Sequence, residues 1–163
     1  MGQRARKRLR RRPAAAGITG ASAGGHLAAL TVVTAEPGVQ VKAAGIFFPP
    51  TDFVKWGDGP PSYDRIGALF FTGGVKGKTE QEINEAARKM SPVFNIKPGL
   101  PPFLIFHGDA DPLVPLQQSQ ELVEALNKAG DAAELIVKPG GAHPWPTIAE
   151  EVAKMADWFD KNL

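Results

Sequence analysis

Gly20-Ala21-Ser22-Ala23-Gly24 is the stretch that decides how this chain is interpreted, because it matches the pattern G-x-S-x-G. It lies between residues 14–19, which we expect to form a strand, and the small-residue-rich residues 24–34, which are compatible with a helix. A sharp strand-to-helix turn forces its serine into a strained conformation and exposes the hydroxyl group. The pattern therefore predicts a nucleophile at Ser22, against the alternative of an ordinary serine in a glycine-rich turn. The amide of Ala23, at the start of the helix, is predicted to face a developing oxyanion.

A serine hydroxyl is a weak nucleophile and needs an imidazole to accept its proton. Of the three histidines, His26 comes four residues after Ser22 and would have to fold back over its own helix. His107 ends an apolar run, and we expect it to pack or to hydrogen-bond locally. His143 lies in a glycine-rich loop after the last expected strand, at the edge of the sheet where sites assemble. We therefore predict His143 as the base.

The base in turn needs a carboxylate that orients it. Asp109 and Asp111 both follow the apolar run 103–107, so both come from the carboxyl end of an expected strand. Either could instead stabilise a turn, which is the usual role of aspartate in such loops. Spacing alone does not choose between them.

The rest of the chain alternates apolar runs with helix-like stretches, a pattern typical of a parallel sheet covered by helices. Expected strands are 14–19, 41–48, 103–107 and 133–137, and expected helices are 24–34, 80–90, 117–129 and 147–163. In the last helix, Ile148, Val152, Met155 and Phe159 follow the spacing of one apolar face. The fold class predicted is α/β, with about four parallel strands in one domain, 14–163. The Pro- and Gly-rich residues 49–102 form a cap-like insertion in this interpretation.

Composition excludes several classes of function. The chain has no cysteine, which excludes disulfides, thiolate metal sites and a cysteine nucleophile. Residues 1–12 hold seven of the 19 Lys and Arg residues. No aromatic residue interleaves with these arginines, so we interpret 1–13 as a disordered basic arm rather than a nucleic-acid-binding segment. No apolar run is long enough to span a membrane. Because no signal peptide is seen, a cytoplasmic location is favoured.

Four motifs together resemble bacterial esterases and lipases of the α/β-hydrolase fold, close to the carbohydrate and feruloyl esterases. Residues 20–30, GASAGGHLAAL, are similar to their nucleophile elbow, and 103–115, FLIFHGDADPLVP, to their acid loop. Residues 141–143, GAH, resemble the histidine loop, and 48–52, FPPTD, resemble an F-G-P-T-D segment with Pro49 in place of glycine. The resemblance implies that Asp111 is the acid, in the order Ser22, Asp111, His143. It also implies upstream strands and an oxyanion motif that this sequence does not contain.

The resemblance implies hydrolysis of carboxylic esters through an acyl-enzyme, without metal or cofactor. The small size of the cap-like insertion favours short- to medium-chain acyl groups. Aromatic and apolar residues of the insertion are candidates for the acyl pocket, Trp56 and Phe70 among them, together with Trp145 beside the base; the others are Phe53, Tyr63, Leu69 and Phe71. For Trp56 and Trp145, a place in the core is an equal alternative. A serine peptidase relative and a weakly active remnant remain alternative functions. Because the strand before Ser22 would lack its outer neighbour, we also expect a homo-oligomer.

Overall fold

The structure is a computed structural model, and it describes residues 16–36, 38–59 and 71–163 of the chain. Two sets of predicted features lie outside the described residues: the basic arm at 1–13, and the candidate pocket residues Tyr63, Leu69 and Phe70. In chain order the elements are β1 (Ala16–Ala21), α1 (Ala23–Val33), β2 (Val41–Phe47), α3 (Glu80–Met90), a 3-10 turn (Pro92–Phe94), β3 (Phe103–Gly108), α4 (Gln117–Lys128), β4 (Ala133–Lys138) and α5 (Ile148–Asn162).

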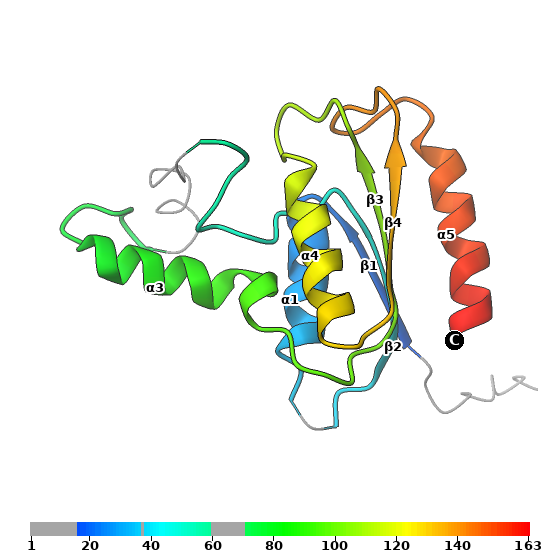
Figure 1. The fold of residues 1–163 in the computed structure, drawn as a ribbon, viewed down its shortest axis with the longest axis horizontal. Coiled ribbons are helices and arrows are strands. Elements are labelled where there is room, and N and C mark those ends of the chain that lie inside the picture. Colours follow the sequence, from blue (N-terminus) through cyan, green and yellow to red (C-terminus); the bar gives the residue numbers. More distant parts are fainter. Residues whose placement is uncertain (1–15, 37, 60–70) are drawn as a thin grey trace, which may run out of the picture.

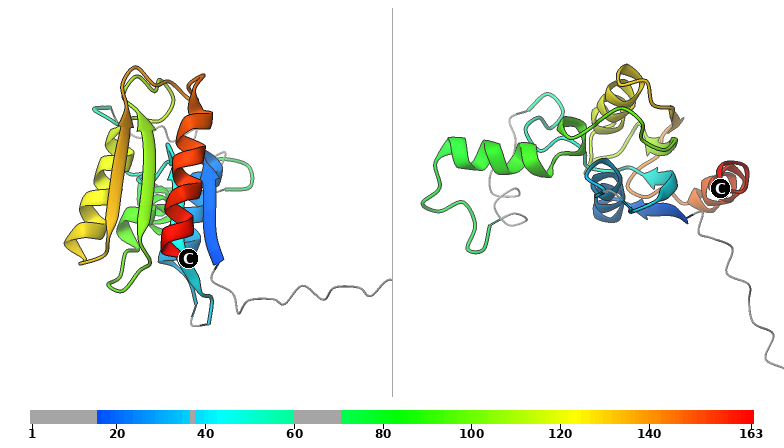
Figure 2. Two further views of the ribbon diagram at one scale, coloured as in Figure 1. Left: turned by 90° about the vertical axis from the view of Figure 1, so that its right-hand side faces the viewer. Right: turned by 90° about the horizontal axis from the view of Figure 1, so that it is seen from below.

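The four strands form one parallel sheet in the order β1-β2-β3-β4. Helices α1 and α4 cover one face and α5 covers the other (Figures 1 and 2). The predicted α/β class and the four parallel strands are thus confirmed. Because all strands run the same way, the loops after β1, β3 and β4 meet at one end of the sheet. These loops carry Ser22, Asp111 and His143.

Two apolar cores hold the helices to the sheet. Toward α1 and α4, the buried set includes Ala29, Ile46, Ile105, Leu122 and Leu126. Toward α5, it includes Phe47, Leu104, Phe106 and Met155. Each large side chain in these layers contributes about 1.5–3 kcal/mol relative to exposure. A strand that is buried on both faces has a continuous apolar sequence. β3 is buried along its whole length, which explains the apolar run at 103–107.

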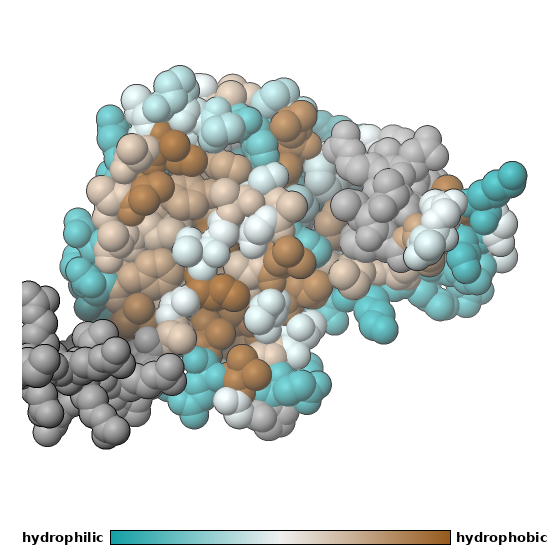
Figure 3. Space-filling model, turned by 180° about the vertical axis from the view of Figure 1, so that it is seen from behind, coloured by the Kyte–Doolittle hydropathy of each residue, from teal (hydrophilic) through white to brown (hydrophobic). Residues whose placement is uncertain are grey.

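One residue of the apolar face predicted for the last helix, α5, is exposed in the structure. Val152 belongs to the apolar row expected along α5, yet its side chain is 52% exposed. Its neighbours in that row pack on the sheet: Met155 is buried, and Phe159 lies against Gly17 of β1. Val152 is exposed because β1 is the edge of the sheet and no further described strand or helix covers α5 there (Figure 2). Hydrophobic surface is widespread on the side of the molecule that Figure 3 shows.

Helix α3 extends away from the sheet (Figure 1) and is fixed by its own terminus and one apolar face. Thr79 and Glu82 form a reciprocal capping box at its start. Such a cap satisfies two backbone N–H groups that the helix leaves unpaired. Ile83 and Ala87 then pack on Phe53. This contact joins the described parts of the cap-like insertion, whose limits at 49–102 remain a prediction.

Candidate active site

The turn between β1 and α1 has the geometry expected of a nucleophile elbow. Ser22 has φ 54° and ψ −121°, a conformation that L-residues rarely adopt. Its backbone N–H donates to the Phe47 carbonyl over 3.0 Å. A Cβ atom at Gly20 would collide with the Gly24 carbonyl, so glycine is required for the close approach. The turn lifts the Ser22 hydroxyl out of the sheet toward the end where the other loops gather.

Ser22, His143 and Asp111 form a continuous chain of hydrogen bonds. The Ser22 Oγ lies 2.8 Å from His143 Nε2, and His143 Nδ1 lies 2.6 Å from Asp111 Oδ2. An ionised carboxylate only accepts, so Nδ1 carries the proton and the Nε2 lone pair faces the serine hydroxyl. The structure thus brings together the three residues predicted from sequence, and their catalytic roles remain a prediction.

Asp111 combines the two roles that the sequence left as alternatives. Its Oδ1 accepts from the backbone N–H groups of Leu113 and Val114 at 2.8 and 2.9 Å, as in a turn stabilised by aspartate. Its Oδ2 faces His143, and the side chain is fully buried. The turn therefore fixes the carboxylate that orients the imidazole.

The His143 imidazole has an aromatic support on its other side. The Phe48 ring lies 4.3 Å from it between centroids, and the indole of Trp145 lies 5.7 Å from Phe48. Trp145 is 3% exposed and its Nε1–H donates to Glu151 over 2.8 Å. Of the two positions that the sequence left open for Trp145, the structure shows the core rather than the acyl pocket. The indole is drawn into the core because a buried acceptor on α5 satisfies its N–H.

A pocket of about 440 Å³ opens beside Ser22 and His143. Its remaining lining residues are almost all apolar: Ala23, His26, Leu27, Pro50, Phe53, Trp56, Met90, Leu113 and Val114. Trp56 and Phe53 were among the candidates from sequence, whereas Phe71 packs behind the pocket wall. Leu27, Met90 and Leu113 were missed. Leu27 and Leu113 are more than half exposed, and no periodic pattern in the sequence marks them.

The His26 side chain lines this pocket, while its backbone N–H donates to the Ser22 carbonyl over 3.0 Å. Its Nε2–H donates to the Met90 carbonyl over 2.8 Å, and its ring meets Phe53 edge-on at 5.0 Å. Burial lowers the pKa of His26, although the bond to Met90 partly opposes that shift. The imidazole therefore ties the end of α3 to α1 and helps to shape the pocket.

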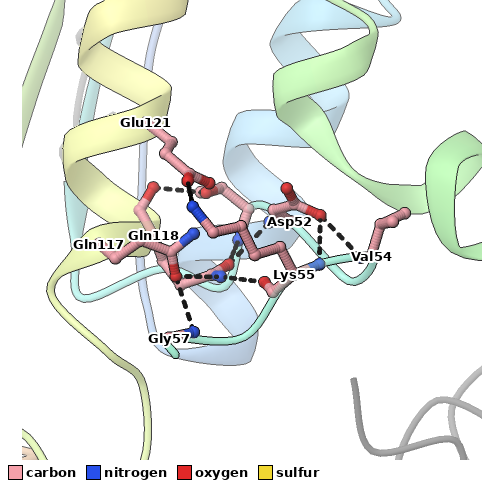
Figure 4. A network of polar contacts seen from close by, with 8 residues as sticks. Asp52, Val54, Lys55, Gly57, Gln117, Gln118 and Glu121 are labelled. Carbon is pink, nitrogen blue, oxygen red and sulfur yellow. Dashed lines mark hydrogen bonds and ion pairs between the residues drawn. The ribbon is translucent and has the colours of Figure 1, made fainter. Parts of the chain in front are cut away.

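The segment that carries Pro50, Phe53 and Trp56 is anchored to the start of α4 through Gln118 (Figure 4). The buried Gln118 side chain accepts from the backbone N–H groups of Thr51 and Asp52 and donates to the Lys55 carbonyl. The Asp52 carboxylate accepts from the N–H groups of Val54 and Lys55. Burial is the main cause that raises the pKa of Asp52. These bonds give the pocket wall a defined conformation without regular secondary structure.

No helix within 16–36, 38–59 or 71–163 combines the length and the apolar character needed to cross a membrane. In the same described residues, no three His, Asp or Glu side chains gather in a way that could hold a metal ion.

Comparisons with known proteins identify the family of this chain. The family model described as BD-FAE matches residues 5–126. The chain is 32% identical over 126 residues to the probable carboxylic ester hydrolase LipM of Mycobacterium tuberculosis, covering 68% of this chain and 27% of LipM. It is 29% identical over 136 residues to esterase LipQ of the same organism, covering 77% of this chain and 31% of LipQ.

Solved structures give the same result. A truncated form of a carbohydrate esterase from gut microbiota superposes with a TM-score of 0.74 and 28% identity, over 90% of this chain and 59% of that one. Thermogutta terrifontis esterase 2 with propionate bound gives a TM-score of 0.63 and 30% identity, over 88% of this chain and 54% of that one. The same esterase has also been solved phosphonylated by sarin. The chain spans less than two thirds of each of these relatives.

Proposed function

This chain belongs to the BD-FAE family of α/β-hydrolases, and on that premise we propose that it hydrolyses carboxylic esters with Ser22, His143 and Asp111 as a catalytic triad. The observation that carries the proposal is the hydrogen-bond chain from Ser22 Oγ through His143 to Asp111, with lengths of 2.8 and 2.6 Å, at the mouth of an apolar pocket. The elbow conformation of Ser22 and the names of the relatives support it.

The proposed reaction is acyl transfer in two steps. Ser22 Oγ attacks the ester carbonyl while His143 Nε2 takes the hydroxyl proton, and Asp111 stabilises the imidazolium. The amide of Ala23, the first residue of α1, faces the oxyanion, since the first N–H groups of a helix have no partner within it. His143 then protonates the leaving alcohol. A water molecule, activated by the same imidazole, hydrolyses the acyl-enzyme and restores Ser22.

The pocket supports a short- to medium-chain acyl group as the bound part of the substrate. Its volume is about 440 Å³, and none of the described residues that line it is Lys, Arg, Asp or Glu. An apolar acyl chain gains free energy on entering such a surface, at about 0.8 kcal/mol per buried methylene group. A charged acyl group would lose its hydration without gaining an ionic partner.

The test compares the wild-type protein with Ser22→Ala on p-nitrophenyl butyrate, and follows labelling by a fluorophosphonate with peptide mass spectrometry. We expect the substitution to lower turnover by roughly 10⁴-fold or more and to abolish labelling. Circular dichroism checks that the variant is folded. Labelling that persists at another serine would contradict the assignment of the nucleophile. Adding a peptide p-nitroanilide distinguishes an esterase from a peptidase.

A further inference from the structure

The imidazole of His107 lies directly under the loop that carries Asp111 and has no part in the reaction as proposed so far. His107 is fully buried at the end of β3, and its two ring nitrogens contact Ser119 Oγ at 2.6 Å and the Val114 carbonyl at 2.9 Å. We propose that His107, held by Ser119, is a positioning residue that keeps Asp111 aligned with His143. This inference rests on the proposed function, because it assigns a task within the same site.

The hydrogen-bond partners determine where the His107 proton lies. The Val114 carbonyl can only accept, so Nε2 carries the proton and donates it. The Nδ1 lone pair then accepts from the Ser119 hydroxyl. Burial lowers the pKa of His107, and nearby His143 lowers it further, against the opposing effects of Val114 and Asp111. The ring is therefore neutral and has a single orientation, which is what a positioning element requires.

Val114 transmits this orientation to the carboxylate. The backbone N–H of Val114 donates to Asp111 Oδ1 over 2.9 Å, while the carbonyl of the same residue accepts from His107. His107 Nε2 also lies 3.5 Å from Asp111 Oδ2, the oxygen that accepts from His143. The N–H of His107 thus anchors the turn that holds Oδ1 and directs a positive dipole toward Oδ2.

Ser119 orients the ring from the opposite side. It lies in the first turn of α4 and is fully buried, next to Gln118, which anchors the pocket wall. Adjacent residues of one helix therefore organise two parts of the site. Ser119 orients His107, which in turn positions the acid Asp111, and Gln118 holds the pocket wall. An apolar residue at 107 could fill the space. It would leave the Val114 carbonyl and the Ser119 hydroxyl without their partner in a buried place.

The decisive experiment is a double-mutant cycle between His107 and Asp111. We expect His107→Gln to lower kcat on p-nitrophenyl butyrate by about tenfold to a hundredfold, the loss typical of a small misplacement of a reacting group, with little change in KM. Ser119→Ala, a milder change, should lower kcat several-fold. In an Asp111→Asn background, neither substitution should change turnover by more than about twofold, since a residue that acts through Asp111 has no effect once the carboxylate is gone.

Asp131→Asn is the matched control. Asp131 is also buried and accepts from the backbone N–H groups of Gly99 and Leu100. It precedes β4, so it lies at the end of the sheet opposite the candidate site, and Asp131→Asn should leave kcat close to wild type. A loss of kcat in His107→Gln that persists undiminished in the Asp111→Asn background would overturn the proposal and show a general structural role.

A readout that does not need turnover separates this proposal from the proposed function. We expect the proton between His143 Nδ1 and Asp111 to give a low-field NMR resonance, which would be assigned by its loss in Asp111→Asn. We expect this resonance to shift or broaden in Ser119→Ala and His107→Gln and to stay unchanged in Asp131→Asn. If the wild-type protein has no esterase activity but the two variants show these shifts, only the proposed function is refuted. An unchanged resonance in both variants would overturn the positioning role. If His107→Gln does not fold, the resonance in Ser119→Ala alone tests the positioning role.

Discussion

The Asp109 carboxylate accepts a hydrogen bond of 2.6 Å from the backbone N–H of Gly140, and this bond joins the loop after β3 to the loop after β4. Two residues further on, Asp111 contacts His143 between the same two loops. Asp109 therefore anchors the backbone of the histidine loop, while Asp111 holds the imidazole itself. The two aspartates, which spacing alone could not rank, have distinct partners in the structure.

Asp111→Asn and Asp109→Asn should consequently have very different effects. An amide at 111 can hold His143 in the wrong tautomer, and loss of the acid in a triad costs about 10⁴-fold in kcat. An amide oxygen at 109 still accepts from the Gly140 N–H, so we expect Asp109→Asn to retain kcat within about threefold, because a neutral acceptor keeps most of such a bond. Steady-state kinetics on p-nitrophenyl butyrate compares the two. The reverse ranking would place the acid at 109.

The sequence identified the loops of this site better than its walls. Ser22 and His143 could be predicted because glycines, strand ends and residue type together restrict the position, and chain order with the family resemblance selected Asp111. Phe53 and Trp56 were recognisable as apolar residues in a Pro-rich segment. Their approach to Ser22 depends on Gln118, and nothing in the sequence connects residues 51–55 with α4 before the fold brings them together.

The local sequence pattern also did not predict burial where a tertiary contact determines whether a side chain is buried. Trp56 and Trp145 both lie in loops, and their surroundings in the sequence did not distinguish pocket from core. Trp145 finds an acceptor in Glu151, six residues away, and turns inward. Val152 has the helical spacing of a core residue, but the face it would cover extends past the edge strand. Burial in these cases is a property of the tertiary arrangement.

Trp56→Ala should shift the acyl-chain preference toward longer chains. The indole lines the pocket, and its removal creates room for further methylene groups, each worth about 0.8 kcal/mol when buried. We expect the ratio of kcat/KM for p-nitrophenyl octanoate over butyrate to rise by about tenfold, the value of roughly two such groups. Trp158→Ala is the control, since this half-buried indole belongs to α5 and packs against the core on the other face of the sheet, away from the pocket. An unchanged ratio in Trp56→Ala would show that the acyl chain binds elsewhere.

Trp145→Phe should weaken both the fold and the alignment of the base. The substitution keeps an aromatic ring against Phe48 but removes the N–H that Glu151 accepts at 2.8 Å. An unpaired buried acceptor costs about 1–3 kcal/mol, so we expect a lower urea midpoint together with a several-fold lower kcat. Lys154→Ala is the control: the Lys154 side chain is exposed, its ion pair with Glu151 is long at 3.6 Å, and Lys138 pairs with the same carboxylate oxygen at 3.2 Å, so the loss should be small. Equal effects of the two substitutions would argue against the anchoring role.

Stability should fall as the pH decreases below about 6.5. Burial lowers the pKa of His107 and of His26 from the ordinary value of 6.5. As the pH decreases, both rings therefore become protonated in the unfolded chain at a higher pH than in the folded chain. The unfolded state then binds more protons, and the free energy of unfolding decreases with decreasing pH. Urea midpoints between pH 5 and 8 measure this slope. We expect it to be shallower in His26→Gln and His107→Gln, and a midpoint that rises toward acid pH would contradict the sign.

The exposed side of α5 next to β1 should drive self-association. Val152 is 52% exposed in the same helical row as Met155, whose sulfur lies 3.3 Å from the Thr19 hydroxyl of β1. Among the described residues, the apolar row therefore runs beside the edge strand of the sheet. An apolar surface next to the backbone groups of an edge strand favours pairing with another chain. We expect light scattering during gel filtration to give a dimer or larger species at micromolar concentration, and Val152→Lys to shift it toward the monomer of 17.4 kDa. Val137→Lys is the matched control, because this valine is 38% exposed on β4, the opposite edge of the sheet. A monodisperse wild-type monomer would refute the association, and equal dissociation by both lysines would move the contact away from β1.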